Sequence, residues 1–367
     1  MVKMQRKSDS AIMGHTGSEP VGGYNGTGIP SGPFPVAVDD GYAQVKSLAF
    51  IGGQTRRTIT PTSVCASVEG ITDLTGEADI RTLGWYETDG RRFTAGERVA
   101  GEETRFASFH TSSLNRVAVY HALAVAGFSG HEVSLVAGLP VADYYLTGAG
   151  INSDLIGRKI ANLKTEVTPL MAGQRPVRVT EVRVLAQAVA AWVDYAVKDN
   201  LDLRDDVDVT APVGVIDIGG RTTDCAVVIQ GNKIEHRRSG TENIGVIDLR
   251  SHLANLVART WAGADNLPPA SLDRAIRTGS LRLFGRDRDV AEMVNEARHI
   301  VSDGIRRAVE RHLVSVADLE AVLIVGGGAL VFPDMEGFFP NGKIVDDPEF
   351  ANARGMIKYV RTQQATE

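Results

Sequence analysis

Two glycine turns, each preceded by an apolar strand and an aspartate, constrain the fold more than any other feature of this chain. The first lies in V-A-V-D-D-G-Y-A-Q-V-K from Val36, and the second in V-G-V-I-D-I-G-G-R-T-T-D from Val213. Asp39 and Asp217 mark the tips of the two strands. The glycines that follow permit positive φ and let amide N–H groups approach an anion closely. The pattern predicts two phosphate-binding turns, each leading into the second strand of a hairpin.

These turns supply the candidate ligands of a nucleotide and its metal ion. Lys46 follows the first turn and can neutralise phosphate as a point charge. Asp39 and Asp217 are suited to hold Mg²⁺ through waters that the ion retains. Arg221 either adds charge to the phosphates or faces solvent, and Asp224 is either a structural or a metal-linked partner. The predicted cofactor-binding residues of the two turns are Asp39, Asp40, Gly41, Tyr42, Lys46, Gly219, Gly220, Arg221, Thr222, Thr223 and Asp224.

A third glycine turn lies in L-I-V-G-G-G-A, which begins at Leu323, and a further helix is expected after Phe332 and Pro333. Taken alone, glycines after an apolar strand are a weak sign of a ligand site. The order of phosphate turn, central helix, second phosphate turn and third glycine turn strengthens the prediction. This order resembles that of the superfamily of actin, sugar kinases and heat-shock chaperone ATPases. Adenosine recognition is then expected on Gly326, Gly327, Gly328 and Ala329.

Arg277, in the sequence A-I-R-T-G, is a further candidate for contact with the base. Its planar guanidinium can pack on the face of an adenine. It can equally be an ordinary surface arginine, and the sequence does not separate the two alternatives.

Composition narrows the function classes. Of the 367 residues, 43% are hydrophobic and 23% are charged, which is typical of a soluble globular protein with room for two domains. The net charge of −6 provides no electrostatic footprint for direct binding of nucleic acid or an anionic membrane. No apolar run approaches the roughly 18 residues that span a bilayer. Cys65 and Cys225 lie in apolar runs and fit a reduced pair in a cytoplasmic protein. The P-loop and dinucleotide-binding glycine motifs are absent from the sequence.

The predicted architecture is α/β with two similar halves. Residues 1–33 are rich in Gly, Ser, Thr and Pro, and we expect a disordered extension there. Residues 34–200 and 201–367 should each form a sheet flanked by helices, since hairpin and helix units recur in both. Helices are expected from Ser112 or Ser113 to Gly127 and at 187–197, 244–261, 290–313 and 350–360, and strands at 133–139, 178–185, 213–229 and 319–325.

Four runs make the resemblance more specific. They are D-D-G-x-x-x-x-K from Asp39 to Lys46, V-Y-H-A-L from Val119, G-L-P-V-A-D-Y-Y from Gly138 and R-K-x-A-N from Arg158. Together they resemble the plasmid-segregation actins of the ParM/StbA family, over nearly the whole chain from Val36 onward. The resemblance implies an actin-like ATPase fold, in which two RNase H-like subdomain pairs surround a central nucleotide cleft. It also implies ATP (or GTP) and Mg²⁺ as ligands, and homopolymeric filaments whose ends a ParR-like DNA-binding adaptor joins to centromere DNA.

The resemblance also assigns catalytic roles. Asp217 is expected to be the Mg²⁺-linked carboxylate, and Gln187 to orient the attacking water, because its amide both donates and accepts hydrogen bonds. The alternative for Gln187 is an ordinary polar residue at a helix N-terminus. ParM relatives can carry glutamate at this place, so the rate of hydrolysis stays open. Gly245 is expected to contact the nucleotide directly, at the start of a helix that connects to it.

Two function classes remain open on the sequence. One is a filament-forming ATPase of DNA segregation, and the other a non-polymerising small-molecule kinase, or another ATPase, of the same fold. A membrane-attached actin relative of the cell-shape type is disfavoured, because the C-terminal end M-I-K-Y-V-R-T-Q-Q-A-T-E is short and polar.

Overall fold

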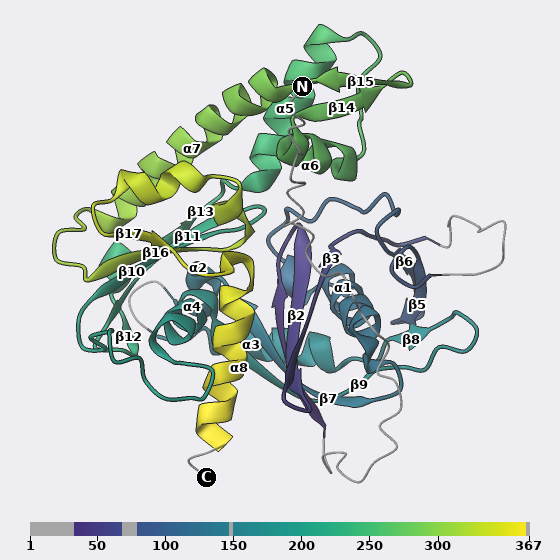
Figure 1. Cartoon of the computed structure of the whole chain (residues 1–367). Helices are drawn as coiled ribbons and strands as arrows, with labels where there is room; N and C mark the ends of the chain where they lie inside the picture. Colours follow the sequence, from purple (N-terminus) through teal and green to yellow (C-terminus); the bar gives the residue numbers. More distant parts are fainter. Residues whose placement is uncertain (1–32, 68–78, 147–149, 365–367) are drawn as a thin grey trace, which may run out of the picture.

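Two sheets with the same strand order form the framework of the molecule (Figure 1). We describe residues 33–67, 79–146 and 150–364 of a computed structural model, so that the extension predicted for residues 1–33 lies outside the described residues except for Pro33. The first sheet has the order β3(Gln54–Pro61), β2(Gln44–Ile51), β1(Phe34–Asp40), β7(Glu132–Leu139) and β9(Arg178–Ala186). The second has the order β12(Lys233–Ile234), β11(Thr223–Ile229), β10(Val213–Ile218), β16(Ala321–Val325) and β17(Gly342–Ile344).

Strand directions are repeated along with the order. In each sheet the first three strands pair antiparallel as a meander, and the fourth and fifth run parallel to the central strand. β13(Gly240–Glu242) adds to the second sheet by pairing with β11. The internal repeat predicted from the two turns is therefore present in the topology.

Each sheet is covered by helices on both faces, which explains why its central strands are continuously apolar. All residues of β10 are buried. One face of the first sheet packs on α1(Ser113–Leu123), while α5(Val246–Thr260) and α7(Ala291–Leu313) cover a face of the second. α3(Ser153–Lys164) lies beside β9.

The remaining faces are covered by exchanged helices. α4(Gln187–Ala196) continues directly from β9 of the first sheet, yet Ala188 and Trp192 pack against the second. α8(Ala351–Gln364) follows the second sheet, yet Ala353 and Met356 pack against the first. This exchange of helices holds the two halves together. The domain boundary that we predicted between residues 200 and 201 stays a prediction.

Smaller elements extend each half. β4(Val64–Cys65), β6(Arg91–Ala95), β5(Gly84–Thr88) and β8(Thr168–Pro169) form a separate sheet beside the first half. α6(Pro269–Thr278) and the hairpin β14(Ser280–Leu283) and β15(Arg286–Asp289) lie with α5 at the top of Figure 1. α2(Val141–Tyr144) is a single turn. Both cysteines are free, but only Cys225 is buried and Cys65 is half-buried, so they form no buried pair.

The predicted helices and strands are largely confirmed. Neither α6 nor the β14–β15 hairpin was predicted, and the helix expected after Pro333 is a 3₁₀ helix over Pro333–Phe338. α6 is short and begins at Pro269, and its hairpin is rich in charge, so both lack the long apolar periodicity that identifies the other elements.

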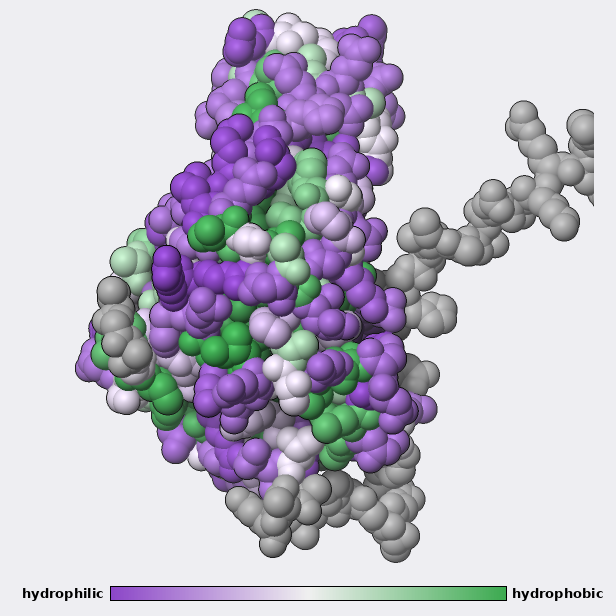
Figure 2. Space-filling model, turned by 90° about the vertical axis from the view of Figure 1, so that its left-hand side faces the viewer, coloured by the Kyte–Doolittle hydropathy of each residue, from purple (hydrophilic) through white to green (hydrophobic). Residues whose placement is uncertain are grey.

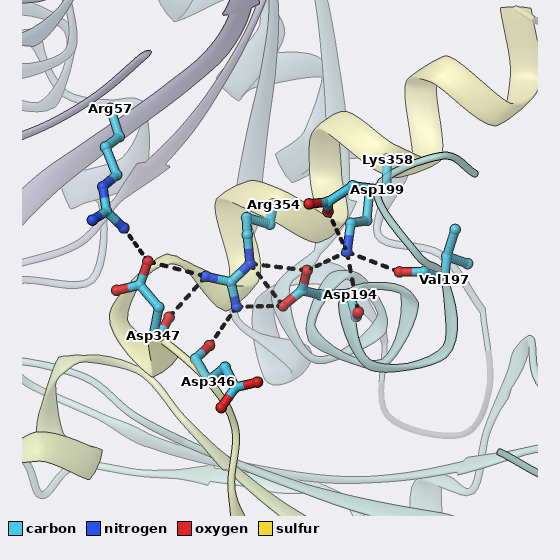
Figure 3. Close-up of polar contacts among 8 residues, drawn as sticks. All are labelled: Arg57, Asp194, Val197, Asp199, Asp346, Asp347, Arg354 and Lys358. Carbon is cyan, nitrogen blue, oxygen red and sulfur yellow. Dashed lines mark hydrogen bonds and ion pairs between the residues drawn. The ribbon is translucent and has the colours of Figure 1, made fainter. Parts of the chain in front are cut away.

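α4 and α8 cross closely because Gly355 has no side chain. A Cβ at Gly355 would lie 1.7 Å from the carbonyl oxygen of Ala190. Beside the crossing, Arg354 of α8 donates from Nε to Asp194 Oδ1 at 3.0 Å, and Lys358 Nζ reaches the same oxygen at 2.9 Å (Figure 3). Arg354 also bonds the Asp347 carbonyl oxygen at 3.0 Å. The buried carboxylate of Asp194 in α4 thus joins two cations of α8. Figure 3 shows that Arg57 of β3 joins this network through Asp347.

Replacing Asp194 with asparagine should destabilise the fold strongly. The change leaves the Arg354 and Lys358 cations without the carboxylate between them, which costs about 3–5 kcal/mol for a buried pair. Asp199→Asn is the matched control, because Asp199 also contacts Lys358, at 3.3 Å, but is 79% exposed. Its loss should cost at most about 1 kcal/mol. Urea unfolding followed by circular dichroism measures both, and equal losses would contradict this account of the crossing.

Candidate nucleotide site

A cavity of about 340 Å³ lies where the tips of the two central strands meet. It is within the size range of small-ligand pockets. Both sheets contribute to its wall, together with α4, α5 and α6. The predicted site residues that line it are Asp39, Gly41, Tyr42, Lys46, Gln187, Asp217, Gly219, Gly220, Thr222, Asp224, Arg277, Gly327 and Gly328.

Asp39 organises the wall that belongs to the first sheet. Lys46 stands opposite it in the β1–β2 ladder, with Nζ 3.3 Å from Asp39 Oδ2. Gln187, the first residue of α4, donates from Nε2 to Asp39 Oδ1 at 2.9 Å. Burial would lower the pKa of Lys46, but the charges of Asp39 and Asp217 raise it above its usual value. The lysine is therefore a buried cation between the two strand tips.

Asp217 organises the opposite wall in the same way. Asn352, the second residue of α8, donates from Nδ2 to Asp217 Oδ2 at 2.7 Å. Each strand-tip carboxylate thus accepts a hydrogen bond from an amide at the start of the helix that follows the fifth strand of its own sheet. We did not predict Asn352 from the sequence. Gln187 begins the helix that follows the fifth strand of the first sheet, and a search at the corresponding place after β17 could have found Asn352 near the start of α8.

Near the strand tips, the carboxylates that line the cavity outnumber the cationic side chains. Burial, together with the charge of Asp39, raises the pKa of Asp217 to about 6. Burial and the charge of Asp217 raise the pKa of Asp224 to about 7. Desolvation and like charges both oppose ionisation, so a cation bound here would favour the ionised carboxylates. Lys46 supplies one positive charge for this group of carboxylates.

The donor set fits a hydrated magnesium ion better than a cage of protein ligands. Among the described residues no three His, Cys, Asp or Glu side chains are placed to hold a metal together. Mg²⁺ commonly uses one or two carboxylates and keeps several waters. Asp39 and Asp217 are available for that role. The Oδ1 atom of Asn352, next to Asp217, is buried and has no hydrogen-bond partner in the described structure, so it can accept from such a water.

The second turn is held in place from behind by the start of α5. The amides of Val246 and Ile247 donate to the carbonyl oxygens of Gly219 and Gly220 at 3.1 and 2.8 Å. A Cβ at Gly245 would lie 2.6 Å from both carbonyl oxygens, so only glycine allows this approach. Gly245 therefore supports the turn from outside the cavity lining, in contrast to the direct contact that we predicted from the sequence.

The two turns touch each other. A Cβ at Gly220 would lie 2.5 Å from the Cβ of Ala43 in the first turn. Arg221 does not line the cavity, and its guanidinium lies 4.9 Å from the centroid of the Tyr42 ring. The hydroxyl of Thr223 donates to the carbonyl oxygen of Ile244 at 2.9 Å. Arg221 and Thr223 thus join parts of the site in this structure, and neither contacts the space of the cavity.

Asp40 points away from the cavity into a buried polar cluster. Lys159 Nζ lies 2.7 and 2.9 Å from its two carboxylate oxygens, and Asn115 Nδ2 donates to it at 2.7 Å. Burial would raise the pKa of Asp40, but Lys159 and His110 lower it to about 2. Asp40 anchors the first turn to α1 and α3, and its predicted direct contact with a nucleotide has no support in this geometry.

The third glycine turn forms a further part of the cavity wall. Gly326 has a φ of +83°, and a Cβ there would lie 2.3 Å from Asp217 Oδ1. A Cβ at Gly327 would meet nothing within 4 Å. Gly327, Gly328 and Arg277 line this part together with Ile276, Leu330 and Val331. Gly326 and Ala329 flank it without being part of the lining. An apolar surface beside a bare backbone can take a flat ring.

Family models match most of the chain. Residues 34–198 match the N-terminal domain of the plasmid segregation protein ParM, and residues 215–335 match the C-terminal domain of the archaeal actin homologue MreB-like. No curated protein sequence was found to match the chain. Among the described helices we find no segment with the length and apolar character of a bilayer span.

Solved structures with the same fold include filament proteins and an archaeal actin. A non-polymerisable quadruple mutant of pCBH ParM is 19% identical, with a TM-score of 0.72 over 90% of this chain and 100% of that one. A ParM from a 15-stranded filament of Clostridium botulinum is 18% identical, with a TM-score of 0.72 over 90% of this chain and 99% of that one. The archaeal actin homologue Ta0583, in complex with ADP, is 19% identical, with a TM-score of 0.69 over 90% and 99% of the two chains.

The repeated strand order, the exchanged helices and these matches confirm the predicted actin-like fold. The chain belongs to the family of actin-like proteins that includes the plasmid segregation protein ParM.

Proposed function

We propose that this protein binds a purine nucleoside triphosphate, ATP or GTP, with Mg²⁺ in the cavity, polymerises in that state and hydrolyses the nucleotide. The observation that carries the proposal is the meeting of two aspartate-tipped turns, one from each repeat, around Lys46. Glycines of both turns line the cavity, which allows the close approach of backbone to an anion that phosphate recognition requires. The apolar part of the wall at Gly327 and Arg277 takes the base.

Hydrolysis follows from positioning and charge neutralisation, which dominate phosphoryl transfer. Lys46 neutralises phosphate charge from its fixed place beside Asp39. Gln187 is held through its Nε2 bond to Asp39, which leaves its amide oxygen to accept a hydrogen bond from the attacking water. Asp217 and Asp39 hold the hydrated ion. Bound there, Mg²⁺ supplies charge stabilisation to the phosphates.

The wider role that we propose is segregation of plasmid DNA in the cytoplasm. The filament would be a homopolymer, with a ParR-like adaptor between its ends and the centromere DNA. The negative net charge supports an indirect link to DNA, because the chain lacks the basic surplus of a direct binder. Figure 2 shows a face that is mostly hydrophilic over its upper part, with apolar residues in separate groups lower down.

Polymerisation tests the proposal directly. With ATP and Mg²⁺, the purified protein should assemble through a contact between opposite ends of the subunit that does not close into a ring. The resulting filaments should pellet on high-speed centrifugation and scatter light. ADP should not sustain the polymer. A protein that stays monomeric at all concentrations while it phosphorylates a small hydroxyl compound would instead be a kinase of the same fold.

Replacing Gln187 with alanine should separate binding from turnover. ATP binding should fall much less than hydrolysis, because Asp39 keeps Lys46 as a partner when the Gln187 donor is lost. Hydrolysis should fall by about 10²-fold, since a water-positioning group is lost. The polymers should therefore last longer in pelleting assays. Gln54→Ala is the control, because Gln54 is exposed on β3 and does not line the cavity. Equal phosphate release from the Gln187 variant and the parent would remove the assigned role.

A further inference from the structure

Asn352 is a buried amide that neither turn motif includes. It is 3% exposed, and its Nδ2 lies 2.7 Å from Asp217 Oδ2. The direction of the amide is fixed by chemistry, since the flipped orientation would face its oxygen toward a carboxylate oxygen. Asn352 therefore acts on Asp217 as a donor.

The amide oxygen of Asn352 is left over. Oδ1 is buried, and no hydrogen-bond partner within the described residues accounts for it. Buried polar atoms in folded proteins nearly always have a partner, which is often an ordered water or a ligand. Asn352 is not part of the cavity lining but contacts a carboxylate that is, so a water that satisfies Oδ1 would lie beside Asp217.

The carboxylate of Asp217 is confined on both sides. Oδ2 accepts the bond from Asn352, and Oδ1 packs so closely on Gly326 that a Cβ there would lie 2.3 Å away. Asp217 consequently has one orientation in which it can face the cavity. The matching pair in the other repeat, Gln187 and Asp39, has an amide in the same position relative to its sheet.

We propose that Asn352 is a positioning residue for the metal-bound nucleotide, a role that rests on the function proposed above. Its Nδ2 holds Asp217 in the orientation that faces the hydrated Mg²⁺ ion, and its Oδ1 accepts a hydrogen bond from one of the waters of that ion. Asn352 touches neither the phosphates nor the attacking water. Its effect is on the strength with which Mg²⁺ promotes nucleotide binding.

The test is the ratio of the ATP dissociation constants in EDTA and in Mg²⁺, measured by titration calorimetry on the full chain. In Asn352→Ala the ratio should fall by roughly 10-fold to 100-fold, the usual cost of removing a partner of a metal ligand, while the affinity in EDTA stays near that of the parent. Asn352→Leu, which nearly keeps the side-chain volume, should give the same loss. Thermal melting by circular dichroism checks that each variant is folded.

Asn341→Ala is the matched control. Asn341 also donates from Nδ2, to the carbonyl oxygens of Val316 and Leu319, and also has a buried Oδ1 without a hydrogen-bond partner among the described residues. Its partners are backbone oxygens of residues outside the cavity lining, whereas Asn352 contacts the lining carboxylate Asp217, so removal of the Asn341 amide should lower the melting temperature and leave the ratio unchanged.

The outcomes separate the two proposals. A parent that binds ATP with a clear gain from Mg²⁺, together with folded Asn352 variants that show the same gain, would overturn the role of Asn352 alone. A parent that shows no gain from Mg²⁺ would overturn the metal site and with it this inference.

Discussion

The structure depends on two buried carboxylates, Asp39 and Asp217, that face one small space from opposite repeats. Carboxylates that are close together and away from water repel each other, and the raised pKa of Asp217 reflects that cost. One lysine offsets part of it from within the chain. A hydrated divalent ion would offset the rest, and the triphosphate that accompanies such an ion would add the contacts that the glycine turns offer. The repulsion between the two carboxylates at the strand tips is thus the source of the affinity for Mg²⁺ and nucleotide that we propose.

Duplication of one sheet explains how the two carboxylates come to the same place. Each central strand has an aspartate as its penultimate residue, and each fifth strand leads into a helix whose first residues reach back to that aspartate. The exchange of α4 and α8 between the sheets brings these helix starts into one region. Farther along, α4 and α8 are joined by the ion pairs of Asp194 with Arg354 and Lys358. A rotation of one half relative to the other must therefore change the packing where α4 and α8 cross. A change of ligand in the cavity can therefore become a change in the angle between the halves.

The sequence allowed the repeated architecture and most of the cavity lining to be predicted, because both depend on local patterns. Apolar strands that end in aspartate and glycine are visible in the chain itself, and the alanine-rich run after Gln187 predicts a helix directly. Asp40 differs from Asp39 only by the alternation of side chains along β1, and this alternation turns it toward Lys159, which lies far away in sequence. Gly245 and Asn352 act through packing on other segments, and α6 has too short an apolar pattern to be recognised. These features depend on tertiary contacts that no local pattern encodes.

The most direct measurement is an experimental structure of the protein with a non-hydrolysable ATP analogue and Mn²⁺ in place of Mg²⁺, with anomalous scattering to locate the metal. The account predicts one strong metal peak between Asp39 and Asp217, with the triphosphate between the two turns and the base beside Gly327 and Arg277. A metal or nucleotide bound elsewhere, with the space between the two aspartates filled only by solvent, would contradict it.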